Sequence, residues 1–96
     1  MTLDSADLKA LTSALADRLY LQVAGWHLYL GDAGLAEDLA IECSALLDQG
    51  AVIAARQALE AVQVPIGGGN TKLPMARLLP SSQLSDLEEI LEDHSR

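Results

Sequence analysis

The 96-residue sequence contains no phenylalanine, and its aromatic residues are limited to Tyr20, Trp26 and Tyr29. The strands of sandwiches and barrels favour aromatic and β-branched residues, whereas leucine and alanine are well suited to packed helices. Half of the residues are apolar, and leucine is the most frequent of them. The composition therefore predicts an all-α fold, with one domain over residues 1–96 and one hydrophobic core.

Cysteine is scarce too, since Cys43 is the single one. One cysteine excludes an internal disulfide framework and fits a reducing compartment. The longest apolar-rich stretch, residues 19–30, is too short to span a bilayer, which takes about 20 residues. The first residues lack the basic start and apolar run of a signal peptide. We therefore expect a cytoplasmic protein without integral membrane association.

Basic residues are few: six Lys and Arg stand against fourteen Asp and Glu, which gives a formal charge of −8. Proteins that bind DNA or RNA neutralise phosphates with cations, so this charge argues against a nucleic-acid partner. Anionic membrane surfaces are disfavoured for the same reason. A basic protein partner fits better, but an acidic surface also serves solubility. The sequence leaves open which of the two roles the charge has.

Apolar residues that recur at steps of three and four predict α-helices along most of the chain. The expected helices cover residues 5–23, 35–49, 51–63 and 82–92. The short link ending at Gly50 makes the second and third helices antiparallel neighbours, and Val52 is expected to face inward. We expect fraying beyond residue 92 because Glu92 and Asp93 oppose the helix dipole. The first three helices are expected to form a small antiparallel bundle.

Residues 64–80 interrupt the helical pattern with all three prolines and the triplet Gly67-Gly68-Gly69. This composition predicts an irregular segment that crosses to the C-terminal helix, with one short helical turn between Met75 and Leu79. A phosphate-binding P-loop needs a different spacing of glycine and lysine. A backbone nest at the three glycines, with Lys72 beside it, could still bind an anion. A small-ligand or anion-binding protein is therefore the alternative function.

The segment from residue 20 to residue 30 holds every aromatic residue and also His27. Tryptophan and tyrosine are enriched at interaction hot spots because they bury a large area with few rotatable bonds. The competing interpretation is that these residues form the centre of a core that has no other aromatics. Burial of Trp26, His27 and Tyr29 within one monomer would exclude an interface.

No group of residues in the sequence resembles a catalytic or metal-binding set. The candidate ligands Cys43, His27 and His94 do not have the short spacings of zinc sites. Cys43 lies on an apolar helix face, where a free cysteine acts as a small hydrophobe. Adjacent acids such as Glu37 and Asp38 point in different directions on a helix. We therefore expect no enzyme activity, no metal and no cofactor.

Two motifs together resemble a family of small cyanobacterial proteins of unknown function. They are Trp26-His27-Leu28-Tyr29-Leu30-Gly31-Asp32-Ala33 and Val64-Pro65-Ile66-Gly67-Gly68-Gly69 with Lys72-Leu73-Pro74. The resemblance supplies no activity. It implies a cytosolic setting in a photosynthetic cell and suggests that the two motifs belong to one surface.

These observations together predict a small non-catalytic module for protein interaction or assembly. Its partner is expected to be another protein or a second copy of the chain. The candidate interaction surface consists of Tyr20, Trp26, His27, Tyr29, Gly67, Gly68, Gly69 and Lys72.

Overall fold

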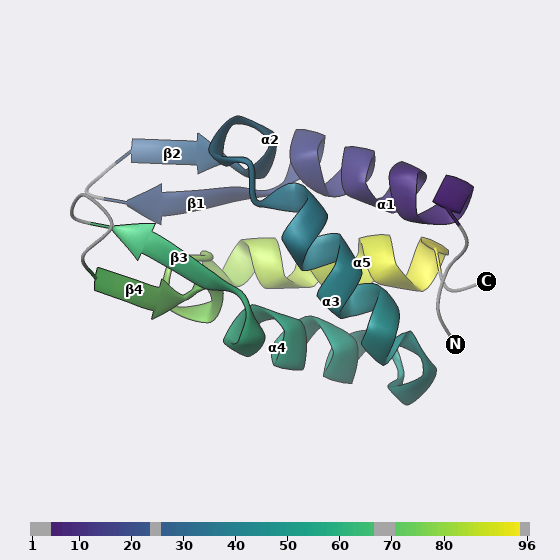
Figure 1. The fold of residues 1–96 in the computed structure, drawn as a ribbon. Coiled ribbons are helices and arrows are strands. Elements are labelled where there is room, and N and C mark those ends of the chain that lie inside the picture. Colours follow the sequence, from purple (N-terminus) through teal and green to yellow (C-terminus); the bar gives the residue numbers. More distant parts are fainter. Residues whose placement is uncertain (1–4, 24–25, 67–70, 95–96) are drawn as a thin grey trace.

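The computed structural model describes residues 5–23, 26–66 and 71–94 (Figure 1). Its longer helices are α1 (Ser5–Arg18), α3 (Ala36–Leu46), α4 (Ala51–Ala61) and α5 (Ser81–His94). Shorter elements are α2 (Leu30–Ala33) and the 3₁₀ turns η1 (Leu47–Gln49) and η3 (Met75–Arg77). The strands are β1 (Tyr20–Val23), β2 (Trp26–Tyr29), β3 (Gln63–Ile66) and β4 (Thr71–Pro74). The fold is mainly helical, but two small sheets correct the expectation of an all-α protein.

The four longer helices form a ring in which each helix packs against two others. α1 contacts α3 and α5, and α4 contacts the same two helices from the other side. Neighbouring helices run in opposite directions along the long axis of the molecule (Figure 1). The expected antiparallel packing is confirmed, and α5 completes the ring.

The core of this ring is built mainly from leucines, as the helical pattern predicts. Fully buried leucines are Leu11, Leu15, Leu19, Leu21, Leu30, Leu39, Leu87 and Leu91. α4 contributes a stripe of buried alanines together with Leu59. The expectation that Val52 faces inward is wrong, because its side chain is 47% exposed.

The predicted helix over residues 5–23 is wrong beyond Arg18, where the chain turns into β1. Tyr20–Val23 pairs antiparallel with Trp26–Tyr29, and Leu30 N–H donates to the Leu19 carbonyl at 3.1 Å. Aromatic and β-branched residues favour such pairing. The apolar spacing of residues 19–26 fits a helix face as well, so periodicity alone could not separate the two structures.

Residues 64–80 are also more regular than predicted, because β3 and β4 form a second antiparallel hairpin. Pro65 is compatible with this hairpin because a strand in a two-stranded sheet has one open edge, where no ladder hydrogen bond is lost. Met75 N–H then donates to the Val62 carbonyl at 2.9 Å and closes the base of the hairpin. The helical turn expected near Met75 is confirmed as η3.

The ends of the other helices agree closely with the sequence pattern. Gly50 stops η1 with φ of 102°, a conformation that residues with a side chain rarely adopt. α5 continues to His94, two residues beyond the predicted end, and His94 Nδ1 lies 2.9 Å from the Ile90 carbonyl. A basic side chain near the C-terminal end of a helix interacts favourably with the helix dipole.

Gly31 lets α2 lie directly against α1. A Cβ atom at this position would sit 3.1 Å from Ala16 Cβ and 3.3 Å from the Ala16 carbonyl oxygen. Gly31→Val is therefore expected to lower the free energy of unfolding by about 1–3 kcal/mol through overpacking. Denaturant unfolding of a double-mutant cycle with Ala16→Gly measures the contact. An equal penalty in both backgrounds would show that the close approach is not its cause.

Candidate functional site

The first hairpin, β1–β2, carries the aromatic residues that the sequence singles out. The Cα atoms of Tyr20 and Tyr29 are paired, and their ring centroids lie 5.6 Å apart with planes tilted by 54°. Tilted rings at this separation attract each other. Tyr20 is half-buried, whereas Tyr29 is 44% exposed. The interpretation of this segment as an entirely buried aromatic core is therefore wrong for Tyr29.

Leu28 adds a second exposed apolar side chain to the same hairpin. It is 38% exposed, although its Cα partner Leu21 is fully buried in the core. Trp26 and His27 both lie in β2, and their side chains are outside the described part of the structure. Because successive strand residues point to opposite faces, Tyr29 lies with Tyr20 on one face of this hairpin, and Leu28 lies with Leu21 on the other.

The outer edge of β1 is covered by the chain that leads into α5. Tyr20 N–H donates to Gln83 Oε1 at 3.0 Å, and Gln22 N–H donates to the Leu78 carbonyl at 3.0 Å. Gln83 is only 6% exposed, and its Nε2 donates to Asp86 Oδ2 at 3.1 Å. These bonds satisfy amide groups that an open strand edge would leave unpaired. They fasten the first hairpin to the bundle.

The second hairpin, β3–β4, presents Thr71 and Lys72 as exposed residues. Lys72 is paired with Pro65 across the hairpin and lies in a strand. Gly67, Gly68 and Gly69 lie outside the described residues. A P-loop places its lysine at the start of a helix, so the structure agrees with rejecting that motif. Anion binding by the glycine backbone stays a prediction.

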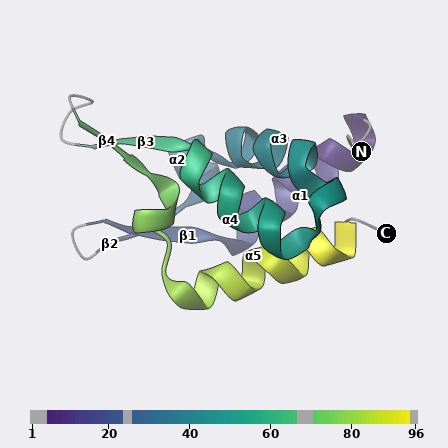
Figure 2. The same cartoon turned by 90° about the horizontal axis from the view of Figure 1, so that it is seen from below.

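Both hairpins project from the same end of the helical ring (Figure 1). The view from below shows the strands diverging into two prongs, with η3 at their base (Figure 2). The expectation drawn from the resemblance, that the two motifs belong to one surface, requires such a common end. We call the described residues Tyr20, Leu28, Tyr29, Lys72 and Arg77 the hairpin-end surface.

Charge is distributed unevenly between the hairpin end and the helices. Residues 19–31 and 61–85 contain no Asp or Glu, whereas the second of these segments carries Lys72 and Arg77. Both basic side chains are exposed. All fourteen acids therefore belong to the rest of the chain. The net charge does not reveal this uneven distribution of acids, although the two acid-free segments are visible in the sequence.

Cys43 lies in the core of the ring, as its place on an apolar helix face predicts, and is fully buried. Burial raises the pKa of its thiol from 9.0 to about 12, and the nearby charge of Glu42 adds to the shift. A thiol with this pKa is a poor nucleophile and a poor metal ligand at neutral pH.

We expect Cys43 to resist alkylation by iodoacetamide at pH 8 in the folded protein and to react rapidly in denaturant. Because the folded pKa is raised, the thiol contributes stability below pH 9.0 that is lost as pH rises toward about 12. Cys43→Ala should flatten that part of the stability curve. Alkylation at the same rate with and without denaturant would contradict the buried position.

Among the described residues, no group of three or more His, Cys, Asp and Glu side chains is placed to hold a metal ion. Cys43 and His94 lie on different helices, α3 and α5. Nor do any of the described helices combine the length and apolar character needed to cross a membrane.

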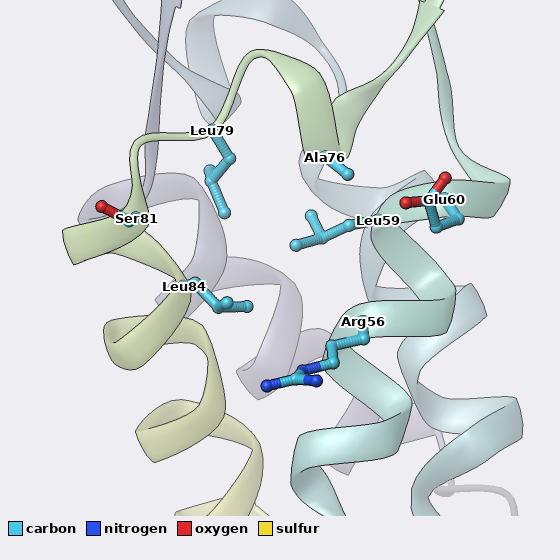
Figure 3. A pocket seen from close by; sticks show the side chains of 7 residues that line it. All are labelled: Arg56, Leu59, Glu60, Ala76, Leu79, Ser81 and Leu84. Atoms are coloured by element: carbon cyan, nitrogen blue, oxygen red, sulfur yellow. The ribbon is translucent and has the colours of Figure 1, made fainter.

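A hollow of about 360 Å³ lies between α4 and α5, where the two helices meet η3 (Figure 3). Its lining residues are Arg56, Leu59, Glu60, Ala76, Leu79, Ser81 and Leu84. The side chain of Arg56 extends from α4 toward α5 at one end of the apolar lining (Figure 3). The few polar groups do not converge on one point, so the hollow shows no constellation for catalysis.

The chain is similar to known proteins along nearly its whole length. The chain is 29% identical over 96 residues to Thylakoid-associated protein slr0729 of Synechocystis sp. (strain ATCC 27184 / PCC 6803 / Kazusa), covering 98% of this chain and 95% of that protein. No solved structure matches the chain. Residues 8–94 match the family described as Protein of unknown function (DUF3181). The resemblance to small cyanobacterial proteins of unknown function is therefore confirmed, and the chain belongs to the DUF3181 family.

Proposed function

We propose that this protein is a small non-catalytic docking module that acts through its hairpin-end surface. The observation that carries the proposal is the exposure of Leu28 and Tyr29, at 38% and 44%, on a hairpin that projects from the bundle. Leu28 and Tyr29 point to opposite faces of this hairpin, so each face presents one exposed apolar side chain to a partner. The buried, protonated Cys43 and the acids spread along the helices support a role without catalysis.

The location proposed for this docking follows from the relative in Synechocystis, which is named as thylakoid-associated. We carry that association to this chain as peripheral attachment. The protein would be cytoplasmic and would reach a membrane from its surface, because no described helix is suited to span one. The sequence alone predicts that this surface binds either another protein or a second copy of the chain.

A sedimentation assay with isolated cyanobacterial membranes tests the proposal. Leu28→Ser/Tyr29→Ser should weaken association of the protein with these membranes at least tenfold, because it removes the central apolar contacts. Ile41→Ser/Val52→Ser is the matched control, since both residues are 47% exposed but lie on α3 and α4. Thermal unfolding confirms that both variants fold. Equal association of the two double variants would refute the proposal.

The same variants separate self-association from docking to another molecule. Size-exclusion chromatography with light scattering gives the oligomeric state of the whole chain. If two copies meet through this surface, Leu28→Ser/Tyr29→Ser should convert a dimer into a monomer, whereas Ile41→Ser/Val52→Ser should not. If the unmodified chain and the Leu28→Ser/Tyr29→Ser variant are both monomers, the surface binds a different molecule and not a second copy of the chain.

A further inference from the structure

The four strands of the two hairpins differ in how their outer edges are protected. Among the described strands, each sheet holds only two, so every strand has one edge without another strand beside it. Such an edge offers unpaired N–H and C=O groups to another chain, and proteins usually blunt it with proline, charge or a covering segment. Leu78 and Gln83 cover the edge of β1 in this way.

Both edges of the second hairpin are blunted by proline. Met75 N–H donates to the Val62 carbonyl, and from there hydrogen-bonded and non-bonded pairs alternate along the antiparallel register. Pro65 in β3 and Pro74 in β4 therefore occupy positions whose backbone groups point away from the partner strand. Each proline removes an N–H group from an outer edge without breaking the ladder. Lys72 adds an exposed charge to β4.

The edge of β2 has none of these protections among the described residues. Its sequence, Trp26–Tyr29, contains no proline, lysine or acid. Leu30 N–H donates to the Leu19 carbonyl, so the same alternation turns the backbone groups of His27 and Tyr29 away from β1. Both views place β1 between β2 and the second hairpin (Figures 1 and 2), so β2 forms the outer side of its hairpin.

From this asymmetry we infer that β2 pairs with β2 of a second copy of the chain, antiparallel about a twofold axis at Leu28. In this register His27 of each copy lies opposite Tyr29 of the other, and the two residues exchange backbone hydrogen bonds. The Tyr29 carbonyl also begins α2, and its second lone pair accepts the bond from the other copy. An edge that pairs with itself in this way gives the self-complementary contact of a twofold dimer.

Leu28 supports this register. Its side chain is 38% exposed in the single chain, although Leu21 beside it in β1 is fully buried. On the axis, the two Leu28 residues form a non-hydrogen-bonded pair, the kind in which side chains approach most closely. Pairing therefore covers an apolar side chain as well as the open edge.

The position of the hairpin leaves room for a second copy. The hairpin projects from the helical ring (Figure 1), and antiparallel pairing places the two rings at opposite ends of a joined four-stranded sheet. A two-stranded hairpin is marginally stable in water, and further strands stabilise it. Because each copy carries a formal charge of −8, separation of the rings also limits repulsion. One short strand is a small interface, so the dimer should be reversible.

The inference goes beyond the proposed function, because it concerns the backbone edge of β2 and needs no membrane. Sedimentation equilibrium of the whole chain, at up to about 1 mM, tests it. His27→Pro removes an outward N–H group from β2 and leaves the ladder to β1 intact, as Pro65 does in β3. We expect dimer affinity to fall at least about tenfold, because two hydrogen bonds are lost across the axis.

Lys72→Pro is the matched control. It removes an outward N–H group from β4, in the other hairpin, so dimer affinity should stay within about threefold of that of the unmodified chain. Circular dichroism and thermal unfolding check that both proline variants fold.

A cysteine placed on the axis tests the register independently of proline. Cα atoms of a non-hydrogen-bonded pair lie about 4.5 Å apart, within the range of a disulfide. Leu28→Cys should therefore give a disulfide-linked dimer when oxidised glutathione is added. Tyr29→Cys is the control, because the two copies of Tyr29 would lie diagonally at about 7–8 Å. Cys43 is buried and is left in place.

The outcomes separate this inference from the proposed function. A monomer at every concentration overturns the inference, and so does equal dimer affinity for His27→Pro and the unmodified chain or equal cross-linking of the two cysteine variants. A chain that is monomeric in solution but binds isolated membranes through Leu28 and Tyr29 keeps the docking function alone. A dimer that binds no membrane keeps the strand pairing and loses the docking function.

Discussion

Leu21→Ala is expected to lower the free energy of unfolding by about 2–5 kcal/mol, the usual cost of emptying a fully buried leucine site. Leu21 has no exposed surface and belongs to the same core cluster as the helical leucines. Among the described side chains of β1, it is the one that is buried. Its loss removes apolar contacts and leaves a cavity at the base of the first hairpin.

Thermal and denaturant unfolding measure this change. For a domain of this size, each kcal/mol corresponds to about 4–8 °C in Tm. Leu28→Ala is the matched control because Leu28 is the Cα partner of Leu21 but is 38% exposed. It should cost less than about 1 kcal/mol. Similar losses for the two variants would mean that the hairpin is not packed into the core.

Gln83→Leu is expected to destabilise the protein by about 1–3 kcal/mol, although it places an apolar residue at a site that is only 6% exposed. The reason is the Tyr20 N–H group, which donates to Gln83 Oε1. Leucine cannot accept this bond, so a half-buried amide on the edge of β1 would lose its partner. The bond from Gln83 Nε2 to Asp86 would be lost as well.

Gln63→Leu is the control for this substitution, since Gln63 is exposed and its side chain reaches only the Glu60 carbonyl, at 3.3 Å. Its effect should stay within about 0.5 kcal/mol. Amide hydrogen exchange gives a local measurement, because Tyr20 should lose protection in Gln83→Leu but not in Gln63→Leu. Unchanged protection of Tyr20 would show that Gln83 does not hold β1.

Both predictions concern the attachment of a docking hairpin to its bundle. Leu28 and Tyr29 keep their positions in β2 only while Leu21 and Gln83 hold the paired strand β1 in place. Variants of Leu21 or Gln83 should therefore weaken docking indirectly, together with stability. Variants of Leu28 or Tyr29 should weaken docking at nearly unchanged stability, which separates a contact residue from a positioning residue.

The helices and most of their buried faces could be predicted from the sequence, because an apolar stripe of period 3.6 is a local property. Leu39, Cys43 and Leu59 are buried as expected. The hairpins were missed for different reasons. In the first, Leu19, Val23 and Trp26 also fit a helical stripe. In the second, Pro65 and the glycines indicated an irregular segment. In each case the next strand along the chain provided the pairing partner, which an apolar period or a proline count does not reveal.

The candidate site was found in part by the same reasoning. Aromatic composition identified β1 and β2, and glycine and proline composition identified the region of β3 and β4. The sequence did not single out Leu28 as an exposed apolar residue, because leucine is so frequent in the core. It also did not single out Gln83, whose role depends on an edge amide 63 residues away in the chain.

The sequence by itself determined a mainly helical protein, a buried cysteine and membership of a cyanobacterial family. These properties follow from short-range periodicity, from composition and from motifs. Only the tertiary structure decided that residues 20–29 and 63–74 form two hairpins at one end of the bundle. Each hairpin pairs two consecutive strands, but the cover on the edge of β1 comes from Gln83, far away in the chain. The two hairpins therefore reach the same end of the molecule only after the helices have packed.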